Sequence, residues 1–170
     1  LCTLFAAPLS AKAQEKEAYV VQSIDETTLT FYYDANIDDR EGTVFPIDET
    51  QTDEEGGYGY PVWAGTSKEA NTWVKKAKFD ASFKDYFPIS IGSWFYNCQA
   101  LETIEGLENI NTSNVEEAFS MFVNCVSLKV LDLSSWDMSK VTDIAEMFYN
   151  CSALTTIYCD SEWNCETSTD

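Results

Sequence analysis

The feature of this sequence that most constrains its fold is a short phrase written three times. The phrase reads FYNCQAL from Phe95, FVNCVSL from Phe122 and FYNCSAL from Phe148, so its copies begin 27 and 26 residues apart. Self-similarity at a fixed period of about 20 to 50 residues is typical of repeat proteins, in which each unit is covered by its neighbours. The sequence therefore predicts a stack of similar units, which offers a surface more readily than a catalytic cavity.

Each unit is expected to contain a short strand, a polar turn and a short helix. In the segment SLKVLDLSSW the leucines fall on one side, as in a strand with one buried face. Apolar residues then recur at positions i, i+3, i+4 and i+7, which is typical of an amphipathic helix. These stripes are Val115, Ala118, Phe119 and Phe122 in one copy and Val141, Ile144, Ala145 and Phe148 in the next. The pattern predicts an α/β fold built as a solenoid.

The start of the chain has the composition of an export signal. Residues 1–13 (LCTLFAAPLSAKA) are mostly small and apolar, and Ala11 and Ala13 stand where a signal peptidase expects small residues. We expect this segment to be a signal peptide remnant and the sequence to be a piece of a longer protein, clipped at both ends. The alternatives are a short buried segment and a lipid anchor at Cys2.

The remaining chain divides into four segments by composition. Residues 14–78 are expected to form an N-terminal β-rich module. Its runs 18–24 and 29–33 predict a hairpin, and we also expect short strands at residues 44–45 and within 73–79. The last three segments are an aromatic capping segment at 79–94, the repeats at 95–165, and a polar tail at 166–170.

Charge excludes several classes of partner. The 170 residues include 10 Lys+Arg and 29 Asp+Glu, no histidine, and a formal net charge of −19. Nucleic acids and anionic membranes both need clustered Lys and Arg, so neither is an expected partner. No segment after the first is long and apolar enough to predict a transmembrane helix. The expected partner is an extracellular protein or a glycan.

The sequence contains no arrangement typical of an enzyme. Without histidine, Ser-His-Asp and Cys-His catalysis are excluded within this chain, and no phosphate-binding or dinucleotide-binding pattern occurs. We therefore expect no enzymatic activity, no cofactor and no bound metal; a glycosidase-like pair among the 29 acidic residues is the alternative, and no residue stands out for it. The nearest metal pattern is DANID at residues 34–38, but Asp39 replaces the glycine of a calcium loop and Phe45 its last glutamate. An ordinary acidic turn is the preferred interpretation.

The cysteines fall into two groups. Cys98, Cys125 and Cys151 recur with the repeat and are predicted to form a buried ladder of small apolar side chains. Cys159 and Cys165 lie outside that register and are candidates for a small disulfide loop in an exported protein. Free thiols are the alternative, because a disulfide needs a specific Cβ geometry. Zinc is disfavoured, since the chain lacks both histidine and a CxxC pair.

Three phrases of the sequence, NTSNVEEAFSMF, LDLSSWDMSKVTDIAEMF and FYNCSALTTI, resemble the BspA-like leucine-rich-repeat surface proteins of bacteria. The likeness covers roughly residues 79–160. It implies an α/β, leucine-rich-repeat-like solenoid and a secreted or cell-surface protein that binds or adheres without catalysis. A structural spacer and a carbohydrate-binding accessory module of a larger extracellular protein are the alternatives.

A binding protein of this kind is expected to use the exposed face of its strands. Large aromatic residues on that face are the expected anchors, although burial in the solenoid is the alternative for each tryptophan. The candidate binding residues are Glu102, Thr103, Lys129, Val130, Asp132, Trp136, Thr155, Thr156 and Trp163.

Overall fold

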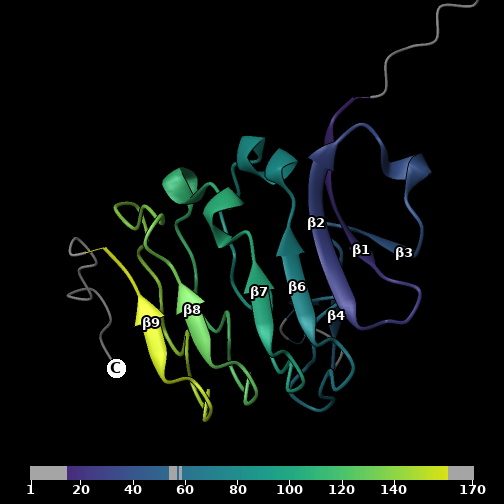
Figure 1. Ribbon diagram of the computed structural model, residues 1–170. Helices are drawn as coiled ribbons and strands as arrows, with labels where there is room; N and C mark the ends of the chain where they lie inside the picture. Colours follow the sequence, from purple (N-terminus) through teal and green to yellow (C-terminus); the bar gives the residue numbers. More distant parts are fainter. Residues whose placement is uncertain (1–14, 54–56, 58, 161–170) are drawn as a thin grey trace, which may run out of the picture.

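The computed structural model of the protein describes residues 15–53, 57 and 59–160. Short strands dominate this part of the chain and form three sheets (Figure 1). The strands are β1 (Glu17–Gln22), β2 (Thr28–Asp34), β3 (Thr43–Pro46), β4 (Thr50–Thr52), β5 (Gly59–Pro61), β6 (Lys76–Phe79), β7 (Thr103–Glu105), β8 (Val130–Asp132) and β9 (Thr156–Tyr158). The helices are the 3-10 turns η1 (Ile37–Asp39), η2 (Ala81–Asp85), η3 (Leu107–Asn109) and η4 (Thr112–Asn114).

The predicted N-terminal hairpin is confirmed. β1 and β2 pair antiparallel with Val20 opposite Phe31, and β3 adds to the other edge of β1. The turn has no glycine, and Asp25 stabilises it by accepting hydrogen bonds from the Ser23 hydroxyl (2.6 Å) and the Thr27 amide (3.3 Å). Such side-chain bonds are why aspartate is favoured in turns. The strands predicted at residues 44–45 and within 73–79 are confirmed as β3 and β6.

One sheet joins the hairpin to the first repeat. β6 lies between β2 and β7 and pairs parallel with both, which gives the strand order β3-β1-β2-β6-β7. β8 and β9 pair parallel in a separate small sheet. The strands β2, β6, β7, β8 and β9 nevertheless lie side by side in one row (Figure 1). They give the molecule one broad strand face.

Aromatic residues fill the core where the hairpin meets the repeats. The ring of Phe31 stacks on Phe79 with 4.3 Å between centroids and on Trp94 with 5.6 Å. The indole Nε1 of Trp63 donates a hydrogen bond to the Trp94 carbonyl at 3.0 Å. These contacts bind the segment that precedes the first repeat to the strands of the N-terminal part.

The expected α/β solenoid of the leucine-rich-repeat type is wrong. The described residues are predominantly β, in several small sheets, and they contain no α-helix. Their helices are 3-10 turns of three to five residues. The described part of the chain does not form a closed leucine-rich-repeat solenoid.

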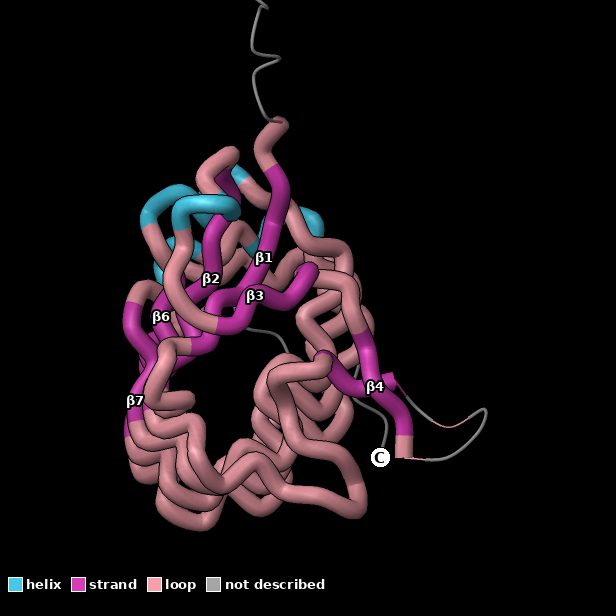
Figure 2. The backbone as a smooth tube through the Cα atoms, turned by 90° about the vertical axis from the view of Figure 1, so that its right-hand side faces the viewer, coloured by secondary structure: helices cyan, strands magenta, loops and turns pink. Residues whose placement is uncertain are grey.

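The helices predicted in the repeats do not form, because the backbone amides of one repeat donate to carbonyls of the next repeat. An α-helix needs each amide to donate to the carbonyl four residues earlier. Here the amide of Ala118 donates to the Asp143 carbonyl (2.8 Å) and that of Phe122 to the Met147 carbonyl (2.9 Å), both in the following repeat. The segments 115–124 and 141–150 are therefore turns that run side by side, opposite the strand face (Figure 2). The apolar residues do recur at helical spacing, but they belong to successive tight turns.

The repeated asparagine has a conformational reason. Asn97, Asn124 and Asn150 have φ angles of 53°, 58° and 55°, in the left-handed region. Asparagine tolerates this region better than most residues, because its short polar side chain bonds locally. The side chains themselves bond to other segments: Asn97 donates to the Thr66 carbonyl at 2.8 Å, and Asn150 donates to Oδ1 of Asn124 at 2.8 Å.

The repeats are held in register by ladders of equivalent side chains. The ring of Phe122 lies between those of Phe95 and Phe148, with centroids 5.8 and 5.7 Å away. Cys98 and Cys125 are fully buried, Cys151 is half-buried, and the Cys125 thiol donates to the Phe95 carbonyl at 3.1 Å. The predicted cysteine ladder is confirmed.

Candidate binding surface

The strand face presents alternate residues of β6, β7, β8 and β9. In β6, Ala77 and Phe79 point into the core, and in β8 Leu131 does so with 1% of its surface exposed. Side chains alternate between the two faces of a strand, so the residues between these point outward. The outward residues are Lys76, Lys78, Thr103, Glu105, Val130, Asp132, Thr156 and Tyr158.

Strand pairing aligns these residues in rows across the face. Lys76 lies opposite Thr103, Val130 opposite Thr156, and Asp132 opposite Tyr158. Paired strands lie about 4.8 Å apart, so each row is a closely spaced line of side chains. Val130 and Tyr158 are 50% and 56% exposed. The face thus combines a polar surface with an apolar patch on its β8–β9 side.

The charges on the face are mixed. Lys76 Nζ and Glu105 Oε1 form an ion pair at 2.5 Å. Such solvated pairs contribute little to stability but hold both groups at the surface. The Asp132 carboxylate accepts hydrogen bonds from the Ser134 hydroxyl (2.6 Å) and amide (3.1 Å), and these bonds lower its pKa. The face therefore carries fixed charges of both signs.

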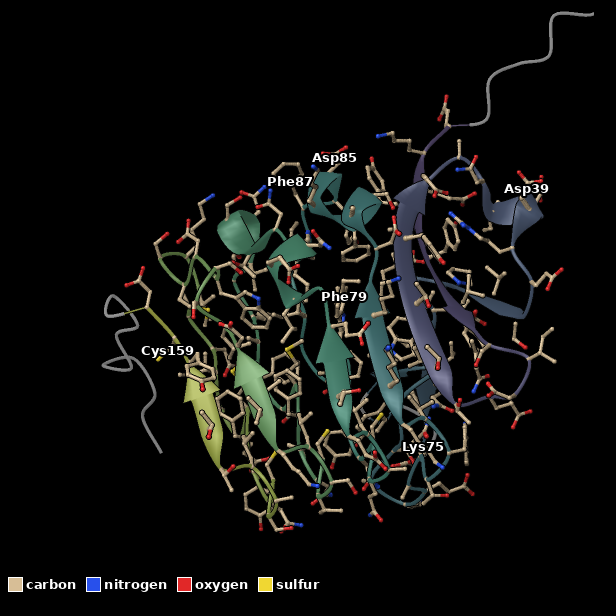
Figure 3. The ribbon with its side chains drawn as sticks, viewed as in Figure 1. Asp39, Lys75, Phe79, Asp85, Phe87 and Cys159 are labelled. Carbon is tan, nitrogen blue, oxygen red and sulfur yellow. The ribbon has the colours of Figure 1, made fainter. Side chains whose placement is uncertain are left out.

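The structure places most of the predicted face residues where they were expected. Thr103 and Asp132 point outward from β7 and β8, and Glu102, Lys129 and Thr155 are exposed directly before β7, β8 and β9. A backbone bond of 2.8 Å joins the Glu102 amide to the Lys75 carbonyl, and one of 3.0 Å joins Thr155 to Lys129. Lys75 marks the lower edge of this face in Figure 3.

Trp136 does not belong to this surface. Trp136 is 4% exposed, and its Nε1 donates a hydrogen bond to the Leu107 carbonyl at 3.1 Å. Its ring is therefore a core residue that joins two repeats. Trp163 and Cys165 lie outside the described residues, so their placement on the face and the expected disulfide stay predictions. Cys159 is exposed directly after β9 (Figure 3).

Sequence reasoning missed the part of the face that β6 provides. Lys76 and Lys78 lie beside β7 because β6 pairs in parallel across a long connection, which local sequence does not reveal. The alternation K-A-K-F, with its apolar residues on one side, was the available signal. Tyr158 was also missed, although alternation along the strand from Thr156 places it on the same face.

The described residues offer no cluster of metal ligands. An open hollow of ≈ 500 Å³ beside β8 is lined by three serines and two aspartates, together with Trp136 and Met138. No group of three His, Cys, Asp or Glu residues in the described ranges is placed to hold a metal ion. In the calcium-like segment, Asp34 already accepts hydrogen bonds from the Tyr19 hydroxyl (2.6 Å) and the Arg40 guanidinium (2.5 Å).

Comparison with known proteins relates the repeats to one family. Residues 89–170 match a family model described as "Mycoplasma protein of unknown function, DUF285". No curated protein and no solved structure matches the chain. The matched segment begins just before the first repeat and includes all three copies, so this part of the chain is similar to that family. The match does not single out BspA-like leucine-rich-repeat proteins.

Within the described ranges, none of the helices has the length and hydrophobicity needed to cross a lipid bilayer.

Proposed function

We propose that the chain is a non-catalytic binding protein, secreted or held at a cell surface, whose strand face contacts an extracellular protein or a glycan. The observation that carries this proposal is the alignment of exposed side chains in rows on β6–β9. The surface location is supported by the signal-like residues 1–13 and by the resemblance of the repeats to bacterial surface proteins.

The shape of the face favours a macromolecule. Small-molecule sites are concave and bury most of their ligand, whereas protein partners use broad surfaces with an apolar centre and a polar rim. Val130 and Tyr158 supply the apolar part, and the charged residues of β6 and β7 supply a polar border. This arrangement favours attachment to a large, fixed partner such as a host protein, another cell or a polysaccharide.

Parallel hydrogen bonding keeps the face in shape without a ligand. Val130 and Asp132 are held in β8 by pairing with β9, and Thr103 is held in β7 by pairing with β6. A preorganised surface loses less conformational entropy on binding, which favours affinity. Side chains on this face therefore provide recognition while the ladders behind it provide stability.

The proposal is tested by a binding screen against extracellular matrix proteins, mucins and polysaccharides. The natural chain is compared with T103R/V130R, which places two bulky charges on the face. The matched control is S139R/A145R, which adds the same charge at exposed positions on the turns. We expect T103R/V130R to lose binding at least tenfold and the control to stay within twofold. A chain that captures nothing is a spacer, and equal losses would place the binding surface elsewhere.

A further inference from the structure

The sideways hydrogen bonds between repeats follow one rule. In the first repeat the amides of Ile91, Ser93, Phe95 and Asn97 donate to carbonyls of the second repeat at 2.7–3.0 Å. In the second repeat the amides of Ala118, Ser120, Phe122 and Asn124 donate to carbonyls of the third at 2.8–2.9 Å. Each donor bonds to the residue that precedes its own equivalent in the next repeat. For example, Phe122 is the equivalent of Phe95, and the Phe95 amide donates to the carbonyl of Met121. Two edges of this kind are therefore covered in the same way.

The third repeat has the same row of backbone amides, and these amides form no hydrogen bond with another described residue. The equivalent donors are the amides of Ile144, Glu146, Phe148 and Asn150, and no acceptor for them occurs in residues 15–53, 57 or 59–160. Unpaired backbone amides along an open edge form a template for a further chain segment.

The side chains of the third repeat are open on the same side. Phe95 and Phe122 are fully buried, but Phe148 is only half-buried. Leu131 is 1% exposed, whereas its neighbour in register, Ile157, is 38% exposed. The ladders of equivalent side chains thus end at the third repeat, where apolar residues remain partly exposed on the side that a further repeat would cover.

We propose that this edge is a docking site for another repeat segment of the same kind. The partner is defined by its chemistry. It supplies carbonyls at every second residue of an asparagine turn, an aromatic ring to stack on Phe148 and an apolar strand beside β9. The observation that identifies this partner is the repeat–repeat interface itself, which the chain forms twice in the same register.

The spacing of the repeats sets the register of a docked segment. Donor and acceptor are 25 residues apart between the second and third repeats, as in the bond from the Ala118 amide to the Asp143 carbonyl. A docked repeat would also add a strand to the β8–β9 sheet and so widen the strand face.

The test inserts a copy of residues 133–158 directly after Tyr158 of the full chain. The measurement is amide hydrogen exchange at Ile144, Glu146, Phe148 and Asn150. We expect exchange at these amides to slow by about tenfold or more. Cys151 should also become less reactive towards alkylation. A block of identical composition in scrambled order is the matched control and should change neither.

A second insert guards against misfolding of the first. A copy of residues 107–132 has the same length and register, and the amides of Phe95 and Asn97 report whether the original repeats remain folded. The proposal is overturned if neither insert slows exchange at the four amides. It is also overturned if deleting residues 161–170 from the natural chain speeds that exchange. Faster exchange on dilution, with a dimer by sedimentation, would overturn it as well, since a second copy would then cover the edge.

Discussion

The phenyl rings of Phe122 and Phe148 lie parallel, with 5.7 Å between centroids and 5° between ring planes. Phe95 and Phe122 repeat the arrangement at 5.8 Å and 7°. The three rings form a column through the repeats, and the backbone bonds beside it use the same register. The position of one repeat therefore determines that of the next, and the strands of the strand face are spaced in the same register.

The column makes Phe122 more important for stability than Phe148. We expect F122A to lower the free energy of unfolding by about 3–5 kcal/mol, because it leaves a cavity in a fully buried position. F148A should cost clearly less, since Phe148 is half-buried and has a described neighbour ring on one side only. Chemical denaturation of both variants measures the difference. Equal losses would contradict the described stack.

Substitutions of Asn124 by alanine and by glycine test the role of its left-handed backbone conformation. At its φ of 58° an alanine is strained by about 1–2 kcal/mol, whereas glycine adopts this region freely. We therefore expect N124A to be less stable than N124G in thermal or chemical unfolding. The opposite order would contradict the left-handed conformation at this position, because both variants lose the Asn124–Asn150 side-chain bond of 2.8 Å equally.

Trp136 offers a control for the binding proposal. W136F removes the indole donor and leaves the Leu107 carbonyl without its 3.1 Å partner, so unfolding should become easier by about 1–3 kcal/mol. Because Trp136 is buried, partner binding by the folded variant should stay unchanged. Loss of binding without loss of stability would place Trp136 on the binding surface after all.

The buried thiols give a pH dependence. Burial raises the pKa of the Cys98 thiol from 9.0 to about 12, and it also raises that of Cys125. The folded state thus keeps protons that the unfolded state loses above about pH 9. Stability from these groups should be fully present below pH 9 and fall as the pH rises towards 12. Unfolding measured from pH 7 to pH 11 tests this, and a flat profile would contradict it.

Reactivity towards an alkylating reagent gives a second readout of the cysteine ladder. In the reduced protein at pH 8 we expect Cys159 to react fast, Cys151 slowly, and Cys98 and Cys125 only on unfolding, because reaction requires an accessible thiolate. Mass spectrometry of the labelled peptides distinguishes the four sites. Rapid labelling of Cys125 in the folded protein would show that the repeats open.

Local patterns in the sequence were reliable guides to local structure. The β-branched runs around Val20 and Phe31 predicted the hairpin, and the repeated phrase predicted the cysteine ladder. The exposed positions Thr103 and Asp132 followed from strand alternation. Neighbouring residues determine the hairpin and the strand face, and the period of the repeat determines the ladder.

Long-range pairing was beyond the reach of the sequence. The stripe from Val115 to Phe122 has helical spacing, but the amides in this segment bond to the next repeat. Spacing alone does not distinguish an amphipathic helix from a series of turns with the same buried positions. The position of β6 beside β7 likewise depends on a parallel pairing with β2 that no local pattern encodes.

The proposal that the strand face binds the partner is tested most directly by side-chain footprinting with hydroxyl radicals, on the free protein and on its complex with a partner from the screen. Val130 and Tyr158 should lose most of their reactivity in the complex. Phe87 and Tyr149 are exposed to a similar degree but do not belong to the strands of this face, so they should keep theirs. Protection of Phe87 or Tyr149 with Val130 and Tyr158 unchanged would contradict the account.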